Sequence, residues 1–298
     1  MVEWRELKEE MQGQRGLVAW VRGQIIPTGT ELASQARKRV WKRYWQGREP
    51  TPVEIEKRVD ELFCSLLDTE YEVYLEYEEI CAQKALELVL SDEGVRRFPR
   101  AAKLLQSALD TVADTQKSTI QRLNEIAVYL RPFYRLFEQS LAQGRMGRAG
   151  GSAQIHLEYL LNQLGYDGEF ETQQVLNGKV DFLFPSRKAW DKDKQRCIIV
   201  SVKRSLRERY KQVFEELGIT GGLTVYLVIT QPVDEARKDL TSDKVENIKK
   251  QNIYLVVRDS VKQQYFPGEQ RVLGFTQFIT QELPLRRQLW KPLMEEEK

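Results

Sequence analysis

Three side chains able to bind metal and phosphate lie in one stretch of this 298-residue chain. Asp181 stands in the short apolar run Val180–Phe184, which ends at a proline as a strand would. Lys203 ends a second run, Cys197–Lys203, which is rich in β-branched residues and typical of a strand. A helical pattern follows and carries Glu216. The spacing therefore predicts two carboxylates and a lysine at one edge of a sheet.

This set of residue types predicts metal-assisted chemistry at phosphate. Asp181 and a glutamate of the helix, Glu215 or Glu216, offer the hard oxygen ligands that bind a divalent cation. A lysine beside the cation can position or deprotonate a water. These are the parts of a metal-dependent phosphodiesterase. The alternative is a strand-edge salt bridge between Asp181 and Lys203.

The surrounding elements predict a mixed α/β domain over residues 146–298, with a mainly helical region over residues 1–145. We expect helices near 152–164, 205–217, 243–251 and 275–281, and strands near 170–174, 180–184, 197–203, 223–230 and 253–258. The helical region, which we expect to serve in dimerisation and as a DNA clamp, includes a capping box at Thr51–Glu54. We expect Pro132 to interrupt its last helix. The glycine-rich segment Gln143–Gly151 predicts a hinge or a phosphate-binding loop.

Charge is uneven along a chain whose net charge is only +2. Residues 187–211 hold ten basic side chains against three acidic ones, a local charge of +7 around the predicted site. Such a run is either a solvated face or an attraction for phosphate, and the neighbouring carboxylates and lysine favour phosphate.

The remaining composition excludes several classes of protein. The three cysteines have no metal-ligand spacing, and the single His156 excludes multi-histidine metal sites. We found no apolar stretch of about 18 residues, and the charged N-terminus differs from a signal peptide. We therefore expect no membrane partner and a reduced, cytoplasmic location.

The residues around Asp181 resemble the PD-(D/E)XK nuclease superfamily. More narrowly, they resemble the type II restriction endonucleases of the EcoRII catalytic-domain, PspGI and SsoII group. Four segments between about residues 145 and 260 carry the resemblance: R-A-G at 148–150, V-D-F-L-F-P at 180–185, S-V-K at 201–203 and L-R-E-R-Y-K-Q-V-F-E-E at 206–216. It implies a PD-(D/E)XK restriction-endonuclease-like fold, with a mixed central sheet flanked by helices.

The resemblance also assigns roles at the site. In the commonest nuclease pattern an acid stands two residues before the lysine, where this chain has Ser201. The resembled group uses a glutamate relocated to the helix, which favours Glu216 over Glu215. Mg²⁺ is then held by Asp181, Glu216 and the backbone carbonyl of Val202, and Lys203 completes the catalytic set. Both one and two metal ions fit this pattern.

A second implied role is the reading of DNA. In the resembled group the triplet that corresponds to Arg207, Glu208 and Arg209 reads the CC and GG parts of the target. Arginine pairs with guanine, and glutamate accepts a hydrogen bond from cytosine. Glu208 has an alternative role, because Ser205 and Glu208 also form a capping-box pattern. Two further basic residues are predicted to contact DNA: Arg148 and Arg204.

One position departs from the resembled pattern. The helix after R-A-G usually carries a glutamate where this chain has Gln154. Glu158 lies one turn later on the same helix face and is a possible secondary acidic residue.

We therefore expect a Mg²⁺-dependent type II endonuclease that cuts double-stranded DNA at a short palindrome such as CCNGG, CCWGG or CCGG. We also expect a homodimer and a DNA methyltransferase in the same system as its functional partner. The rivals are a repair or structure-directed nuclease and a non-catalytic DNA-binding protein on the same scaffold.

Overall fold

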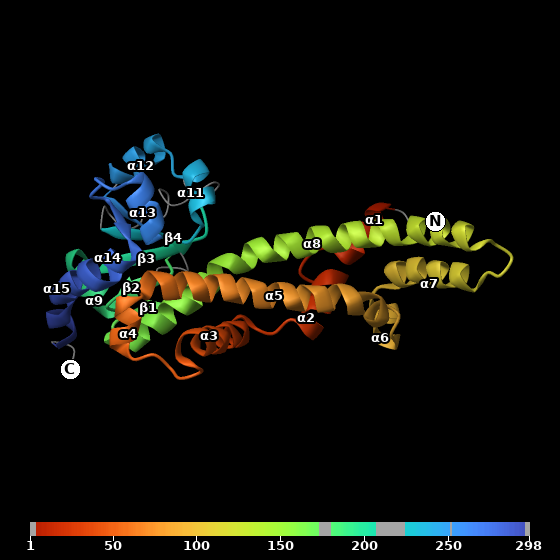
Figure 1. Cartoon of the computed structure of the whole chain (residues 1–298), viewed down its shortest axis with the longest axis horizontal. Coiled ribbons are helices and arrows are strands. Elements are labelled where there is room, and N and C mark those ends of the chain that lie inside the picture. The colour runs from red at the N-terminus through yellow and green to blue at the C-terminus, as the bar shows by residue number, and fades with distance from the viewer. Residues whose placement is uncertain (1–3, 173–179, 207–223, 251, 296–298) are drawn as a thin grey trace. The chain divides into compact units, whose positions relative to one another are not determined.

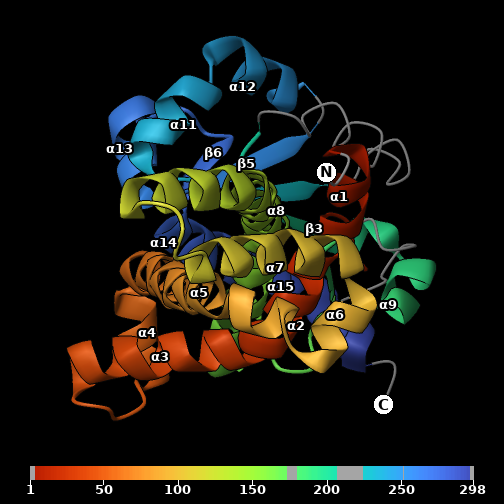
Figure 2. The same ribbon diagram turned by 90° about the vertical axis from the view of Figure 1, so that its right-hand side faces the viewer.

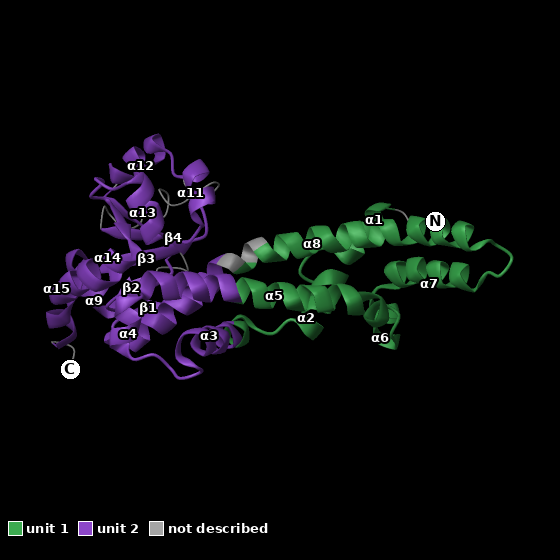
Figure 3. Cartoon of the chain, viewed as in Figure 1, with its two compact units in different colours: residues 1–32, 70–148 green, residues 33–69, 149–298 purple. Residues whose placement is uncertain are grey.

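The computed structural model describes residues 4–172, 180–206, 224–250 and 252–295. The chain divides into two compact units, coloured separately in Figure 3. The first unit comprises residues 1–32 and 70–148, and the second comprises residues 33–69 and 149–298. The boundaries between them fall inside three helices: α3 (Gly29–Trp45), α5 (Val59–Val89) and α8 (Thr119–Leu161).

The second unit is built on a six-stranded mixed sheet (Figure 1). Its strands lie in sequence order, antiparallel from β1 to β3 and parallel from β3 to β6. This confirms the predicted mixed sheet, and β6 is a strand that the sequence did not indicate. The strands are β1 (Glu171–Thr172), β2 (Phe182–Phe184), β3 (Ile198–Lys203), β4 (Val225–Ile229), β5 (Ile253–Val257) and β6 (Val272–Gly274).

Each face of the sheet packs against its own layer of helices. On β3, Val200 and Val202 contribute to one core and Ile199 to the other, because successive side chains alternate between faces. The first face is covered by the second-unit parts of α3, α5 and α8 with α4 (Pro52–Lys57), η3 (Phe278–Glu282), α14 (Phe275–Gln277) and α15 (Leu283–Glu295). The second face is covered by α9 (Arg187–Lys192), α11 (Val233–Asp239), α12 (Ser242–Lys249) and α13 (Asp259–Tyr265).

The sequence predicts that residues 33–69 belong to the helical region 1–145, but in the structure they belong to the second unit. These residues belong to the same unit as the sheet because apolar side chains of α3 and α5 enter its core. Trp41 and Phe63 are almost fully buried there, and the Phe63 ring packs edge-on against Phe275, with ring centroids 4.9 Å apart. Burial of aromatic rings of this size is a strong reason for the segment to remain with the sheet.

The first unit is helical, as predicted (Figure 2). Its core gathers side chains such as Met11, Val21, Phe133 and Phe137. No helix within the described ranges has both the length and the apolar character needed to cross a membrane. Besides its parts of α3, α5 and α8, this unit contains α1 (Trp4–Met11), α2 (Leu17–Ile25), α6 (Asp92–Arg97) and α7 (Pro99–Ala113).

Two predicted breaks in the chain are wrong. Pro132 lies inside α8, and the glycine-rich segment Gln143–Gly151 is helical and part of the same element. Glycine costs about 1 kcal/mol relative to alanine inside a helix, so local propensity alone favours a loop here. At Gly144 an added Cβ would lie 2.2 Å from the Arg22 guanidinium, so a larger residue there would displace that side chain.

Candidate active site at the ends of β2 and β3

The register of β2 and β3 determines where Asp181 lies. The two strands are antiparallel and pair Phe182 with Val200. Continuing this register by one residue puts Asp181, which directly precedes β2, opposite Ser201. Alternation along β3 then turns Ser201 and Lys203 to the same face of the sheet. The predicted proximity of the aspartate and the lysine follows from this pairing.

Three donors converge on one oxygen of Asp181. Oδ2 accepts hydrogen bonds from Ser201 Oγ at 3.0 Å, from the Val202 backbone N–H at 2.6 Å and from Lys203 Nζ at 3.2 Å. The Asp181 and Lys203 side chains are 25% and 15% exposed, so both remain accessible to a ligand. The carboxylate is therefore fixed in orientation by its own chain.

The direction of the Val202 carbonyl follows from that of the Val202 N–H. The N–H and C=O groups of one strand residue point to the same side of the strand, and the Val202 N–H points to Asp181. The next carbonyl, that of Lys203, accepts from Thr230 N at 3.1 Å on the β4 side. A carboxylate and a backbone carbonyl on the same side provide hard oxygen ligands of the kind that Mg²⁺ binds. These two groups fit the predicted metal, although the role of Val202 as a ligand stays a prediction.

The other predicted ligand and the predicted DNA-reading triplet lie outside the described residues. Glu216, its alternative Glu215, and Arg207–Arg209 all belong to residues 207–223. Among the residues that the structure describes, no group of three His, Cys, Asp or Glu side chains could hold a metal ion. The role of Glu216, or of its alternative Glu215, as the second carboxylate stays a prediction.

The sequence analysis missed Asp239, whose side chain binds the backbone at Leu206, just before residues 207–223. Its side chain is 1% exposed, and its Oδ2 accepts a hydrogen bond from the Leu206 backbone N–H at 2.7 Å. Lys244 Nζ donates to the other oxygen at 3.0 Å. This buried ion pair fixes the backbone one residue before Arg207. No local pattern could have indicated it, because Asp239 and Leu206 are 33 residues apart.

Gln154 and Glu158 differ in their relation to the site. Gln154 Nε2 donates to the Asp181 backbone carbonyl at 3.3 Å, so the residue that stands in place of the expected glutamate supports the backbone at Asp181. Glu158 is partly buried, and burial raises the pKa of its carboxyl group. Its role as a secondary acidic residue stays a prediction.

The two other arginines predicted to bind DNA have contacts within their own units. Arg204 Nη2 lies 3.8 Å from Glu235 Oε1, and both side chains are about half exposed. Arg148 Nη2 donates to the Pro27 carbonyl at 3.1 Å, and its guanidinium lies over the Tyr74 ring, 5.0 Å from the centroid. Contact of either residue with DNA stays a prediction.

The arrangement of sheet and site defines a class of protein. A mixed sheet between helices, with an aspartate before one strand and a lysine ending its neighbour, is a restriction-endonuclease fold of the PD-(D/E)XK type. Two solved structures share it. One, metal-depleted Ecl18kI in complex with uncleaved, modified DNA, aligns with a TM-score of 0.72 and 17% identity over 97% of this chain and 86% of that chain. The other, a PspGI–substrate DNA complex, aligns with a TM-score of 0.54 and 17% identity over 88% of this chain and 94% of that chain.

Sequence comparison identifies the family. Residues 112–279, more than half of the chain, match the family described as EcoRII C terminal. The type II restriction enzyme EcoRII of Escherichia coli is 34% identical over 82 residues, which span 26% of this chain and 20% of that enzyme. The chain therefore belongs to the family described as EcoRII C terminal.

Proposed function

We propose that this protein is a Mg²⁺-dependent endonuclease that cuts double-stranded DNA at a short palindrome containing CC and GG. The observation that carries the proposal is the convergence of Lys203 Nζ, Ser201 Oγ and the Val202 N–H on one oxygen of Asp181. A carboxylate oriented by three donors, next to a lysine and a backbone carbonyl, is the arrangement that phosphodiester hydrolysis with a metal requires.

In this proposal Asp181, Glu216 and the Val202 carbonyl hold the Mg²⁺ ion. When bound, the ion polarises the scissile phosphate and stabilises charge on the leaving oxygen. Lys203 is held 3.2 Å from Asp181 Oδ2, which directs its ammonium group toward the place where a phosphate oxygen or an attacking water would lie. Ser201 acts through Asp181, by keeping the carboxylate in one orientation.

Base recognition is proposed for Arg207, Glu208 and Arg209. The family resemblance supports this role, and the pairing chemistry of arginine with guanine and of glutamate with cytosine agrees with a CC/GG target. The hydrogen bond from Leu206 N–H to the buried Asp239 adds support, because it anchors the backbone immediately before the triplet. An anchored backbone fixes the register in which the side chains that follow it can meet base edges.

We also propose that the active species is a homodimer, since a palindromic target is matched by two-fold symmetry. The first unit offers an apolar surface for this contact, at the end of α7 and the beginning of α8. Four side chains there are more than half exposed: Val112, Ile120, Leu123 and Val128. In sedimentation experiments Ile120→Asp should shift the dimer toward monomer, and an unchanged dimer would exclude this surface.

In the cell, the proposed partner is a DNA methyltransferase of the same system, acting in the cytoplasm. Its modification of the target would protect host DNA. Plasmid methylated at the predicted site should therefore resist cleavage, and equal cleavage of methylated and unmethylated plasmid would argue against this pairing.

Digestion of unmethylated plasmid with Mg²⁺, followed by sequencing of the fragment ends, tests the proposed function. Discrete bands whose ends lie within a CC/GG palindrome are the expected result. A smear without a common sequence would instead indicate a repair or structure-directed nuclease. Intact plasmid with both Mg²⁺ and Mn²⁺ would indicate a DNA-binding protein without catalysis.

A further inference from the structure

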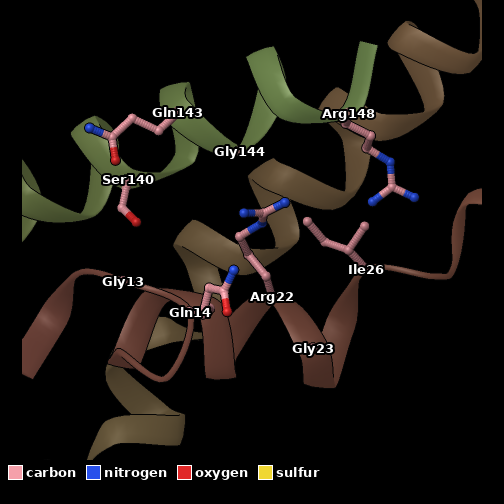
Figure 4. Close-up of a pocket in the computed structure, with 10 residues that line it drawn as sticks. Gly13, Gln14, Arg22, Gly23, Ile26, Ser140, Gln143, Gly144 and Arg148 are labelled. Atoms are coloured by element: carbon pink, nitrogen blue, oxygen red, sulfur yellow. The ribbon is translucent and has the colours of Figure 1, made fainter. Parts of the chain in front are cut away.

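A pocket within the first unit, which includes Arg148 among its lining residues, is lined mainly by basic, amide and glycine residues (Figure 4). Its volume is about 540 Å³, which lies within the roughly 300–1,000 Å³ of small-molecule sites. None of the described residues that line it is acidic or aromatic. The polar side chains around it are Arg22 of α2, Ser140, Gln143 and Arg148 of α8, and Gln14 of the loop before α2.

Arg22 is the central side chain of this pocket. Among the described residues, its Nε is buried and has no hydrogen-bond acceptor. The guanidinium lies directly against Gly144, where a Cβ would be 2.2 Å from Nη1. A partly buried cation without a partner is costly, since burying a charge is favourable only when it is paired. This position therefore favours an anion from outside the chain.

Arg148 brings a second positive charge to the same pocket. Figure 4 shows Arg22 and Arg148 extending into the space between α2 and α8. Arg148 uses one nitrogen for the Pro27 carbonyl, while its Nε is buried without an acceptor. Burial is the largest reason that the pKa of Arg148 lies below its usual range; Tyr74 and Glu70 raise the pKa in part, and the charge of Arg22 lowers it. Two like charges in one pocket repel each other, and a shared anion would remove this repulsion.

We propose that this pocket is an oxyanion site that takes a phosphate group, with Arg22 and Arg148 as its charged donors. Arginine forks match the geometry of phosphate oxygens, and Ser140, Gln143 and Gln14 offer neutral donors around them. The absence of aromatic rings among the described lining residues argues against recognition of a base by stacking. The phosphate can come from the DNA backbone or from a free phosphate in solution. The proposal does not depend on DNA cleavage.

The test uses the full chain without DNA or metal. Inorganic phosphate is added at constant ionic strength, against chloride, and the melting temperature is measured. We expect a saturable rise for the wild type. Arg22→Met should weaken the apparent affinity for phosphate at least about tenfold, because it removes charge-assisted hydrogen bonds. Gly144→Ala is a second variant that keeps the net charge but displaces the guanidinium, and it should weaken binding in the same direction.

Arg5→Met is the matched control, since Arg5 is an exposed cation of the same unit that pairs with Glu9. It should leave phosphate binding unchanged. A wild type that responds equally to phosphate and chloride would overturn the proposal. So would an Arg22→Met variant that binds phosphate as the wild type does, or an equal loss in the Arg5→Met control.

A second experiment separates the two sources of phosphate. The affinity for a DNA duplex is measured as a function of salt concentration for the wild type and Arg22→Met. The slope of the logarithm of the binding constant against the logarithm of the salt concentration is compared for the two proteins. A slope smaller in magnitude by about one in the variant identifies a contact with the DNA backbone. An unchanged slope, together with the loss of phosphate binding described above, identifies a site for free phosphate. Because neither measurement requires cleavage, a failure here is distinct from a failure of the proposed nuclease activity.

Discussion

The charged side chains at the end of β3 and in the pocket between α2 and α8 differ in whether the chain itself supplies their hydrogen-bond partners. At the sheet, one oxygen of Asp181 receives three donors from its own chain. In the helical unit, Arg22 Nε is buried and has no acceptor within the described residues. The first site is oriented before any ligand arrives, which is the condition for catalysis by positioning. The second is completed only by a ligand, which is the condition for binding.

Removing the charge of Asp181 is the strongest test of this difference. Asp181→Asn keeps the size of the side chain but loses the charge that holds a cation. We expect the rate of plasmid cleavage to fall by at least about ten-thousandfold, while the melting temperature changes little. Timed digestion on gels measures the rate. Residual cleavage within a factor of ten of the wild type would show that the carboxylate is not part of the catalytic centre.

Lys203 should have the next largest effect. Lys203→Met removes the ammonium group but retains the aliphatic stem, and we expect cleavage to fall about a hundredfold to a thousandfold. Binding of Mg²⁺, followed by calorimetry, should persist, because the carboxylates remain. Loss of metal binding together with cleavage would instead assign Lys203 a role in keeping the site folded.

A smaller effect is expected at Ser201, which acts only through Asp181. Ser201→Ala removes one of the three hydrogen bonds to Oδ2, and the other two still orient the carboxylate. We expect the cleavage rate to fall less than about tenfold. A variant as inactive as Asp181→Asn would mean that the serine hydroxyl takes part in the chemistry directly.

Asp60 lies in the same unit as Asp181 but outside the candidate site. We expect substitution of Asp60 to change the free energy of unfolding and not the cleavage rate. Burial raises the pKa of Asp60 to about 6, although its side chain accepts a hydrogen bond from Asp259 N–H at 3.0 Å. The folded-state pKa exceeds the unfolded value, so folding favours the protonated Asp60 carboxyl group. The contribution of this group to the free energy of unfolding is therefore fully present below about pH 4 and is lost as the pH rises through about 6.

Asp60→Asn keeps an acceptor and removes the buried charge. The variant should be more stable than the wild type by about 1 kcal/mol at pH 7.5 after allowance for partial exposure, with little advantage at pH 4.5. Urea unfolding at the two pH values measures the difference. An advantage that is the same at both pH values would contradict the assignment of the effect to this carboxyl group.

Local patterns in the sequence predicted the centre of the fold. The β-branched run 197–203 and the short run at 180–184 became neighbouring strands, and their pairing brought Asp181 to Lys203. The capping box at Thr51–Glu54 is also present, with Thr51 N–H donating to Glu54 Oε2 at 2.8 Å. In both cases the deciding interactions are between residues close in sequence or between strands that the sequence marks as short, continuous apolar runs.

Features that depend on distant contacts could not be predicted. The glycines of residues 143–151 favour a loop by propensity, but the segment is helical, and at Gly144 the contact comes from Arg22 on another helix. Residues 33–69 pack with the sheet through apolar contacts that no sequence motif indicates. The bond between Asp239 and Leu206 is a similar case. For Glu216 and Arg207–Arg209, the sequence and the family resemblance remain the basis of their assignment.

The central claim is that Asp181 and Glu216 share one divalent cation beside Lys203. A crystal structure of the full chain with Mn²⁺, which accepts the same oxygen ligands as Mg²⁺, tests it most directly through the anomalous signal of the metal. The account predicts an anomalous peak in contact with the carboxylates of both Asp181 and Glu216. A metal bound without Glu216, or bound through Glu215 in its place, would contradict it.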